Sequence, residues 1–582
     1  MSLRPRTNAP AYIDIKLHCQ SRSPLQGTLE VQGWSSAEMV CVQQIGDLAL
    51  FSGTSNQRVL LPTALRGRAV EEVRLRFLAS GAVYDLGRFM TTGEMSAKRQ
   101  YVIALCRPQV GFGEPQNLTW RALRPESVLP DDRSRGIEVA TTPVWFAPED
   151  MPAAIGLCAF DLVLLEGPAL ASLSEKQLAD LTTWVEAGGS LCLVGARDLK
   201  PEHRAFLQRL ALPDDDAAAK AQPSFLRRAG LGRVALIDTA PSSEDQLMSE
   251  PWTTATYHLA HSHVSNRTAG IIAAARRGYS NSNWYYDYGT LNDMEQQMLQ
   301  ALPRTARLIP LPVLGVILIG FILVVGPGEW IFLGRLRRRV WTWVTFPAVA
   351  IGCAFLTVRV AEHYLGVQDQ HAFMVITDYS PQGKALRENR FELWFAGRNR
   401  DAVTDVRQAL TVPSHQRNTS RGTEGLKPPV YEGRVPAHYT MRQPLFQWTP
   451  FIQRTLTFAP PVASSRLSWE ALHELPPRYS ANKTQIHDVQ SADFVTEKIG
   501  AKNWNVYVFQ PRLPRSERPS LAERLCMHPN DGWAFTRSPS GDATMSDVFL
   551  DHEPDDMIVV AERQVGQEIQ IQRCVYHFDS HE

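Results

Sequence analysis

The sequence predicts a multidomain fold: an N-terminal β-sandwich, a doubly wound α/β domain, a hairpin of two transmembrane helices and a C-terminal β-rich domain. Three observations predict it. Short strand patterns fill both ends of the chain, unbroken apolar runs flank a capped helix between residues 100 and 290, and two long apolar runs lie between residues 309 and 358. A chain of 582 residues has room for roughly three or four domains of ordinary size.

The net charge of the chain is zero and does not indicate a strongly charged binding partner. Lys plus Arg and Asp plus Glu number 60 each, so we expect neither nucleic acid nor a strongly acidic partner. The eight cysteines show no CxxC spacing, which argues against a zinc ribbon or a thioredoxin-type site. Cys19 with Cys41, or Cys526 with Cys574, would suit disulfides in an oxidising compartment; free buried thiols are the interpretation that we favour.

Residues 10–98 have the pattern of short strands separated by turn residues. Apolar and polar residues often alternate, as expected for strands with one buried face. The predicted strand segments are YIDIKLHC, GTLEVQGW, LALFSG, QRVLLP, VEEVRLRFL and VYDLGRFM. This many short strands in fewer than about 100 residues are typical of a β-sandwich of immunoglobulin-like size.

The pattern changes between residues 100 and 290. The runs 101–106, 160–166 and 190–195 are apolar without alternation, as expected for strands buried on both faces of a parallel sheet. A helix lies between the last two runs. Its predicted features are a capping box at Ser172 and Glu175, an apolar face of Leu178, Leu181, Trp184 and Val185, and an end at Gly188-Gly189. A strand, a capped helix and a second strand form a βαβ crossover, which predicts a doubly wound α/β domain. A further helix from Pro201 to Leu212 and a strand from Gly232 to Ile237 extend it.

The segment FDLVLLEGPALASLSEKQLADLTTWVEAGGSLCLVGARD resembles the class I glutamine amidotransferase-like domain, which has a flavodoxin-like fold. In the active members of that family, a Cys nucleophile follows the strand at a strained turn, the elbow. The elbow of this chain falls at Gly195 and Ala196 and has no Cys, while Cys192 lies within the strand. The resemblance therefore implies the fold without the amidotransferase chemistry, and we expect no catalytic residue there.

Two apolar runs, residues 309–333 and 340–358, predict the transmembrane hairpin. Each is close to the roughly 20 residues that cross about 30 Å of hydrocarbon. A buried hairpin in a soluble core is the alternative, which we do not favour because Glu329 is the one charge in the first run and the second has none. A helix from Leu291 to Leu302 leads into the membrane, so the membrane region covers residues 291–364 and the lipid bilayer is an expected partner.

The turn of the hairpin carries the residues that predict its orientation: Arg335, Arg337, Arg338 and Arg339. Short basic loops stay in the cytoplasm, so both soluble regions should lie outside an inner (cytoplasmic) membrane. Export of the first 300 or so residues needs a leader, and the N-terminal residues contain no apolar segment of that kind. We favour a leader that precedes the sequence; a cytoplasmic placement of both regions is the alternative.

The order of the segments, and the phrase VVGPGEWIFLGRLRRRVWTW above all, resembles a group of uncharacterised bacterial membrane proteins. That resemblance implies an association with transport or cell-envelope machinery, and hence other membrane or envelope proteins as partners.

Three further features are weaker candidates for a site. The GxG at Gly111–Gly113 is expected to be a plain turn rather than a phosphate loop. His258, His261 and His263 could bind a metal, but no HExxH or paired acidic motif accompanies them, so we expect a solvated loop and no metal or cofactor. The aromatic run 284–288 could be an interfacial anchor, a binding platform or a packed loop.

Residues 365–582 are again rich in strand patterns. The predicted strands are HAFMVITD, NRFELWFAG, RTLTFAP, WNVYVFQ, MIVVAER and EIQIQRCVYHF, with polar loops at 414–427 and at about 512–546. No Ser-His-Asp order or nucleotide loop is recognisable.

These observations predict a membrane-anchored, non-catalytic scaffold or binding subunit of a cell-envelope or transport-associated system. One alternative is a hydrolase or transferase whose nucleophile lies outside the elbow. Another is an envelope carbohydrate-binding protein, suggested by the 14 tryptophans and the aromatic run. The missing elbow Cys favours the first interpretation over the enzyme.

Overall fold

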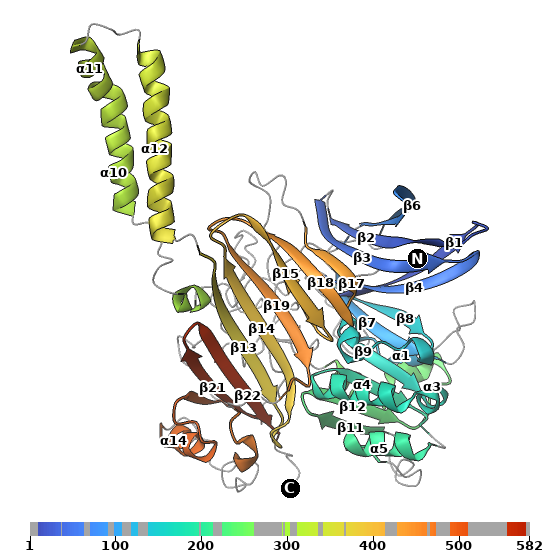
Figure 1. Ribbon diagram of the computed structural model, residues 1–582. Coiled ribbons are helices and arrows are strands. Elements are labelled where there is room, and N and C mark those ends of the chain that lie inside the picture. Colours follow the sequence, from blue (N-terminus) through green and yellow to red (C-terminus); the bar gives the residue numbers. More distant parts are fainter. Residues whose placement is uncertain are drawn as a thin grey trace.

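The computed structural model shows a body built of sheets, from which a pair of long helices projects (Figure 1). The residues that the structure describes are 10–35, 38–62, 70, 72–90, 98–107, 118–125, 138–196, 199–213, 224–260, 294, 297–302, 311–335, 341–365, 368–413, 428–461, 466–472, 489–509 and 556–577. Within them the chain is multidomain and rich in β-sheet, as the sequence predicted, with a mixed α/β sheet and two apolar helices.

The N-terminal region packs one sheet against another. A small sheet pairs β1 (Ala11–Cys19) with β4 (Gly53–Leu61), and its alternating residues Ile13, Ile15 and Leu17 are buried. We call the larger one the shared sheet; its order is β15 (Arg400–Arg407), β18 (His438–Leu445), β17 (Val430–Arg434), β3 (Glu38–Leu50), β2 (Leu25–Ser35), β5 (Glu72–Ala79) and β6 (Ala82–Met90). The predicted strand segments here all contribute to strands. The segment 48–53, however, spans the end of β3, a turn at Phe51 and the start of β4.

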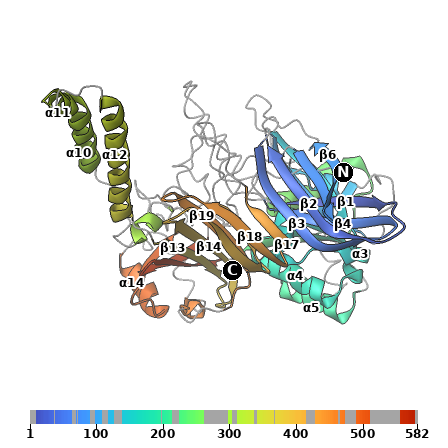
Figure 2. The same ribbon diagram turned by 45° about the horizontal axis from the view of Figure 1, so that its top comes forward.

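The shared sheet contains strands from both sides of the helical hairpin. Val430 to Glu432 of β17 pair in parallel with Val42 to Gln44 of β3, and the Val42 amide donates to the Pro429 carbonyl oxygen at 3.1 Å. Figure 2 shows β17 and β18 beside the N-terminal strands. The N-terminal and C-terminal strands therefore do not form two separate domains as the sequence suggested, because β15, β17 and β18 complete the N-terminal sheet.

The α/β region contains the parallel sheet, whose strands the apolar runs predicted. Its order is β11 (Ser224–Ala229), β12 (Gly232–Ile237), β10 (Ser190–Val194), β9 (Leu162–Glu166), β7 (Lys98–Cys106) and β8 (Glu138–Phe146). All neighbouring pairs are parallel except the edge pair of β11 and β12. Leu191 to Val194 lie between two parallel partners and are fully buried, so the predicted central strand is confirmed.

The helix before β10 is α4 (Glu175–Glu186), and its predicted apolar face is confirmed because Leu178, Leu181, Trp184 and Val185 are all buried. The predicted capping box was wrong by two residues. Ser174 is the N-cap and exchanges hydrogen bonds with Gln177, whereas Ser172 ends a short preceding helix, α3 (Gly167–Ser172). Leu173 is extended between the two helices, so α4 can begin only after Ser174.

The remaining elements of this region are short. They are α1 (Leu118–Ala122), η2 (Pro148–Asp150), η3 (Ala154–Ala159), α5 (Pro201–Arg209), η4 (Glu244–Met248) and α7 (Trp252–Leu259). The predicted helix at 201–212 ends three residues early, where Ala211 takes a φ of 55°. Of the predicted helix at 291–302, residues 294 and 297–301 are helical, and Met294 and Met298 are buried.

The C-terminal sheet has the order β16 (Leu410–Pro413), β19 (Pro450–Phe458), β14 (Ala385–Phe395), β13 (Gln370–Tyr379), β22 (Glu568–Tyr576), β21 (Met557–Val565) and β20 (Asn505–Phe509). Part of one face is covered by η7 (Trp469–Leu472) and α14 (Val489–Lys498). Each predicted C-terminal segment contributes to a strand. The sequence missed β15 to β18. Charged residues obscure the alternation in β15, β17 and β18, which belong to the shared sheet, and β16 has only four residues.

The hairpin consists of α10 (Leu311–Leu323), a π-helical turn η5 (Val324–Gly328) around Pro327, α11 (Glu329–Arg335) and α12 (Thr342–Leu365). Within the described residues, 312–335 and 342–363 are the helices long and apolar enough to cross a membrane. Among these residues only Leu333 and Ala361 are buried, and most of the others are exposed. The Thr345 hydroxyl donates to the Glu329 carboxylate, which gives the charge in the first run a partner on the second helix.

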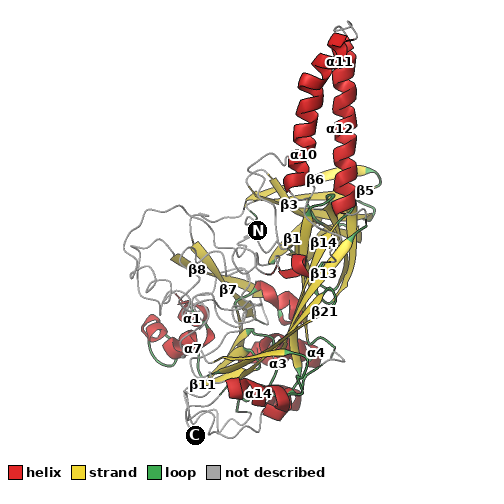
Figure 3. Cartoon of the chain, turned by 90° about the vertical axis from the view of Figure 1, so that its left-hand side faces the viewer, coloured by secondary structure: helices red, strands yellow, loops and turns green. Residues whose placement is uncertain are grey.

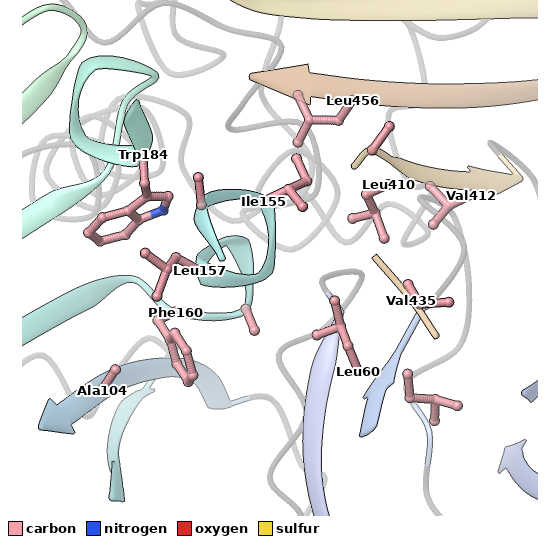
Figure 4. Close-up of a cluster of buried hydrophobic side chains, with 14 of the residues drawn as sticks. Leu60, Ala104, Ile155, Leu157, Phe160, Trp184, Leu410, Val412, Val435 and Leu456 are labelled. Carbon is pink, nitrogen blue, oxygen red and sulfur yellow. The ribbon is translucent and has the colours of Figure 1, made fainter. Parts of the chain in front are cut away.

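The largest cluster of buried apolar residues runs through the body. It joins residues of the shared sheet, one face of the parallel sheet and the C-terminal sheet. Figure 4 shows the meeting point, where Ile155 and Leu157 of η3 lie between Trp184 of α4 and Leu456 of β19, with Leu60 of β4 close by. The three β-containing regions therefore form one packed body.

Candidate functional site

The carboxyl edge of the parallel sheet is the place where its fold concentrates polar side chains. The parallel strands lie in the spatial order β8, β7, β9, β10 and β12. If they are numbered 1 to 5 as they occur along the chain, this order is 2-1-3-4-5, the strand order of flavodoxin-like sheets. The order reverses between β7 and β9. Ligands of doubly wound proteins bind outside the carboxyl ends of the strands at such a reversal, so the ends of β7 and β9 define the candidate site.

An ion pair occupies this reversal. Arg107 follows β7 and Glu166 ends β9, and Arg107 Nη2 donates to Glu166 Oε1 at 3.0 Å. The guanidinium also stacks on Trp145 of β8, 4.9 Å from the ring centroid. Arg107 Nε is shielded from solvent and has no hydrogen-bond partner among the described residues, so one donor of this arginine is unused. Neither residue stands out in the sequence by itself; their positions at the carboxyl ends of two buried apolar runs were the available signal.

The predicted elbow lies one strand away and carries no nucleophile. Gly195 follows β10 with a φ of 62°, and its amide donates to the Ile237 carbonyl oxygen at 2.9 Å. The start of α3 approaches it so closely that a Cβ on Gly167 would lie 2.0 Å from the Gly195 carbonyl oxygen. Gly195 and Ala196 therefore build a tight, left-handed turn of the kind an elbow needs, but neither has a side chain that could attack a substrate.

The cysteines near this edge are buried thiols. Cys192 lies inside β10 with no exposed surface, and burial raises its pKa well above the usual range. Burial also raises the pKa of Cys106, the last residue of β7, to about 12, with a smaller contribution from Glu149. The nucleophile and metal ligand is the thiolate, which neither residue forms near neutral pH. The cysteines in the described ranges are all free thiols, and Cys526 lies outside those ranges.

The histidine cluster is described only at its first member. His258 lies on the exposed side of α7, and its Nε2 is 3.0 Å from the Arg227 carbonyl oxygen. His261 and His263 lie outside the described residues, as do the GxG at 111–113 and the aromatic run 284–288. Within the part of the chain that the structure describes, no three His, Cys, Asp or Glu side chains come together as metal ligands.

The orientation residues of the hairpin are described in part. Arg335 ends α11, at the tip of the projecting pair of helices, while Arg337, Arg338 and Arg339 lie outside the described residues. Figure 1 shows this tip at the far end of the hairpin from the body. Arg335 and the body of sheets are thus separated by the full length of the two helices.

A second polar constellation joins the C-terminal sheet to the α/β region. Asp378 of β13 accepts from Arg387 Nε at 2.6 Å and from Arg573 Nε at 2.6 Å, and all three side chains are buried. Arg387 Nη1 also donates to the Ala187 carbonyl oxygen at 3.2 Å, at the carboxyl end of α4. A cation at a helix carboxyl terminus is favourable because the last carbonyl groups have no partner within the helix.

The same interface has a second buried ion pair. Arg228 Nη1 of β11 lies 2.8 Å from Asp556 Oδ2, and His577 Nδ1 lies 2.8 Å from the other oxygen of Asp556. Sequence reasoning missed these contacts because their partners are 328 and 21 residues apart along the chain.

No family model matches the chain, and no curated protein matches it at a significant level.

Proposed function

We propose that the chain is a membrane-anchored, non-catalytic scaffold or binding subunit of a bacterial cell-envelope or transport-associated system. The pairing of β17 with β3 carries this proposal, because it makes one hydrogen-bonded sheet from chain segments on either side of the hairpin. A hairpin inserted between the strands of a single body is suited to hold that body at a membrane.

The topology follows from the same pairing. Two transmembrane helices return the chain to the side from which it started, so the segments before and after the hairpin can meet in one sheet. In our proposal the protein spans the inner membrane with the basic turn after Arg335 in the cytoplasm and the body on the opposite face.

The non-catalytic part of the proposal rests on the carboxyl edge of the parallel sheet. The strand order supports a flavodoxin-like, amidotransferase-like domain, and the left-handed Gly195 occupies its elbow. Cys192 is too deeply buried to replace an elbow thiolate. The N-terminal strands are proposed to form an immunoglobulin-like sandwich completed by β17, β18 and β15. Such surfaces suit protein contacts, with other membrane or envelope proteins as partners.

The proposal is tested by purifying the tagged full chain from membranes in a mild detergent and identifying what co-purifies in stoichiometric amount. We expect the chain to stay in the membrane pellet after alkaline carbonate extraction and to bring down a defined membrane or envelope protein. The same purification from cells that express a tagged, unrelated two-helix membrane protein is the control. Release of the chain by carbonate would overturn the membrane anchor. Stoichiometric labelling of one low-pKa Cys by a thiol-reactive activity probe would overturn the non-catalytic assignment.

A further inference from the structure

The edge strand β6 of the shared sheet exposes several large apolar side chains in addition to its two charged residues, Asp85 and Arg88. Val83 is 61% exposed, Met90 is 65% exposed, and Leu86 and Tyr84 are exposed as well. Exposed apolar edge strands promote aggregation of a soluble protein, because their backbone N–H and C=O groups can pair with another chain and their apolar side chains favour association. A contiguous group of such residues marks a contact with another molecule or with a membrane.

The position of β6 relative to the hairpin favours the membrane. Figure 1 and Figure 3 look along perpendicular directions, and in both of them β6 lies level with the base of the helical hairpin. The helices stand nearly upright in both views, so a plane drawn across their base passes along β6. A bilayer that holds α10 and α12 would therefore have its surface at this strand.

The backbone of β6 argues against a further strand as the occupant. Gly87 pairs with Leu75 and Asp85 pairs with Arg76, so Leu86 is the extra residue of a β-bulge. A bulge interrupts the regular row of donors and acceptors that a second strand would need. The side chains of β6, by contrast, suit a lipid interface. Tyr84 has an apolar ring with a polar end, and the exposed Arg88 could meet a phosphate headgroup.

We propose that β6 lies on the bilayer surface, with Val83, Leu86 and Met90 among the lipid headgroups and the upper acyl chains. The body then touches the membrane at two separate places, the base of the hairpin and β6, which fixes its orientation. This inference rests on the proposed membrane anchor, since without a bilayer around the hairpin there is no surface at the level of β6.

The test places one fluorescent amino acid at a time into the full chain by stop-codon suppression, so that the native cysteines do not interfere. The three positions are Val83 on β6, Ile319 in the middle of α10 and Ala205 on the exposed side of α5, at the opposite end of the body in Figure 1. Each variant is reconstituted into phosphatidylcholine nanodiscs, one chain per disc, with nitroxide on either the headgroup or the mid-chain carbon. We expect headgroup nitroxide to quench the Val83 probe severalfold more than the Ala205 probe.

The Ile319 probe separates the two claims. Quenching of Ile319 by mid-chain nitroxide, without quenching of Val83, would overturn the contact of β6 with lipid and leave the anchor intact. No quenching of Ile319 would overturn the anchor itself. A Val83→Asp/Met90→Asp variant provides a second measurement: the body should tilt more freely, seen as a loss of linear dichroism in aligned bilayers, while Ile319 stays quenched. An unchanged dichroism would contradict the proposal.

Discussion

Asp378 and Arg573 face each other in register on the parallel strands β13 and β22 and form a fully buried, two-point ion pair. Arg573 Nε lies 2.6 Å from one carboxylate oxygen, and Nη2 lies 2.9 Å from the other. β13 is the first strand after α12. β22 is the last described strand along the chain, and it lies between β13 and β21 in the sheet. The pair thus joins the strand that leaves the membrane hairpin to the carboxyl-terminal end of the fold, and Arg387 extends it to α4.

Removal of the carboxylate at this position should be severely destabilising. Asp378→Ala removes the carboxylate that pairs with the buried Arg387 and Arg573, and breaking a buried pair in this way typically costs about 3–5 kcal/mol. Thermal unfolding of the detergent-solubilised chain measures it. The matched control is Asp405→Ala, whose carboxylate pairs with Arg407 and His438 on the exposed side of β15 and should contribute about 0–1 kcal/mol. Equal losses for the two variants would contradict a structural role for the buried pair.

Gly195 should resist substitution for a conformational reason. Its φ of 62° is in the left-handed region, where an L side chain costs roughly 1–2 kcal/mol, although the nearest atom to an added Cβ is 3.6 Å away. We therefore expect Gly195→Ala to lower the free energy of unfolding by about that amount. Gly46→Ala is the control, because an added Cβ meets nothing within 4 Å there and the backbone is not left-handed. A neutral Gly195→Ala would show that the turn relaxes.

Cys192 should behave as a core residue and not as a reactive thiol. Cys192→Ser places a hydroxyl on the fully buried strand β10 among apolar neighbours, which costs about 1–3 kcal/mol where no hydrogen-bond partner is present. The half-buried Cys19 gives the control, since Cys19→Ser should change stability by less than about 0.5 kcal/mol. Rapid alkylation of native Cys192 under non-denaturing conditions would contradict the burial that supports these expectations.

The parts of the fold that sequence reasoning anticipated are those encoded locally. The run Leu191–Val194 is apolar without a break, and only a strand covered on both faces can bury every one of its side chains. The hairpin is equally local, because an uninterrupted stretch such as 342–358 is an adequate signal by length alone. At the candidate site, the absence of a side chain at Gly195 was visible for the same reason.

What the sequence did not reveal depends on contacts across long separations. β17 carries Glu432 and Arg434 in five residues, and it becomes a strand because β3, nearly 400 residues earlier, offers its edge. The ion pair of Arg107 and Glu166 is similar, since only the strand order brings the two carboxyl ends together. The capping box lies at Ser174 and not at the predicted Ser172 for a local reason, because Ser172 is already the last residue of helix α3.

Glu562 should make stability depend on pH. This side chain on β21 is half-buried, and burial raises the pKa of its carboxyl in the folded state. The folded chain therefore holds this proton to higher pH than the unfolded chain, and stability falls as the pH rises through the unfolded value, about 4.3, and then the folded one. Glu562→Gln should be more stable than the parent at pH 7, with the difference narrowing as the pH is lowered toward 4. Denaturant unfolding across that range is the measurement, and a difference independent of pH would contradict the burial effect.

The orientation of the body can be tested because the shared sheet links its two halves. Ser242 lies before the hairpin and Val403 after it, both exposed, and the pairing of β17 with β3 requires them to be on the same side of any membrane that holds α10 and α12. The basic turn at Arg335 to Arg339 favours the cytoplasm for the tip of the hairpin and hence the outside for both positions.

We therefore expect Ser242→Cys and Val403→Cys to react equally with a membrane-impermeant thiol reagent in intact cells, after the labelling of the unsubstituted chain, with its partly exposed Cys19 and Cys158, is subtracted. Protection of both until lysis would place the body in the cytoplasm and show that four arginines in the turn had been carried across, against the charge rule. Labelling of one position and protection of the other would separate β17 from β3 by a bilayer, which no hydrogen-bonded sheet can cross in that way. That result would refute the shared sheet itself, whereas the two concordant results decide only which face of the membrane it occupies.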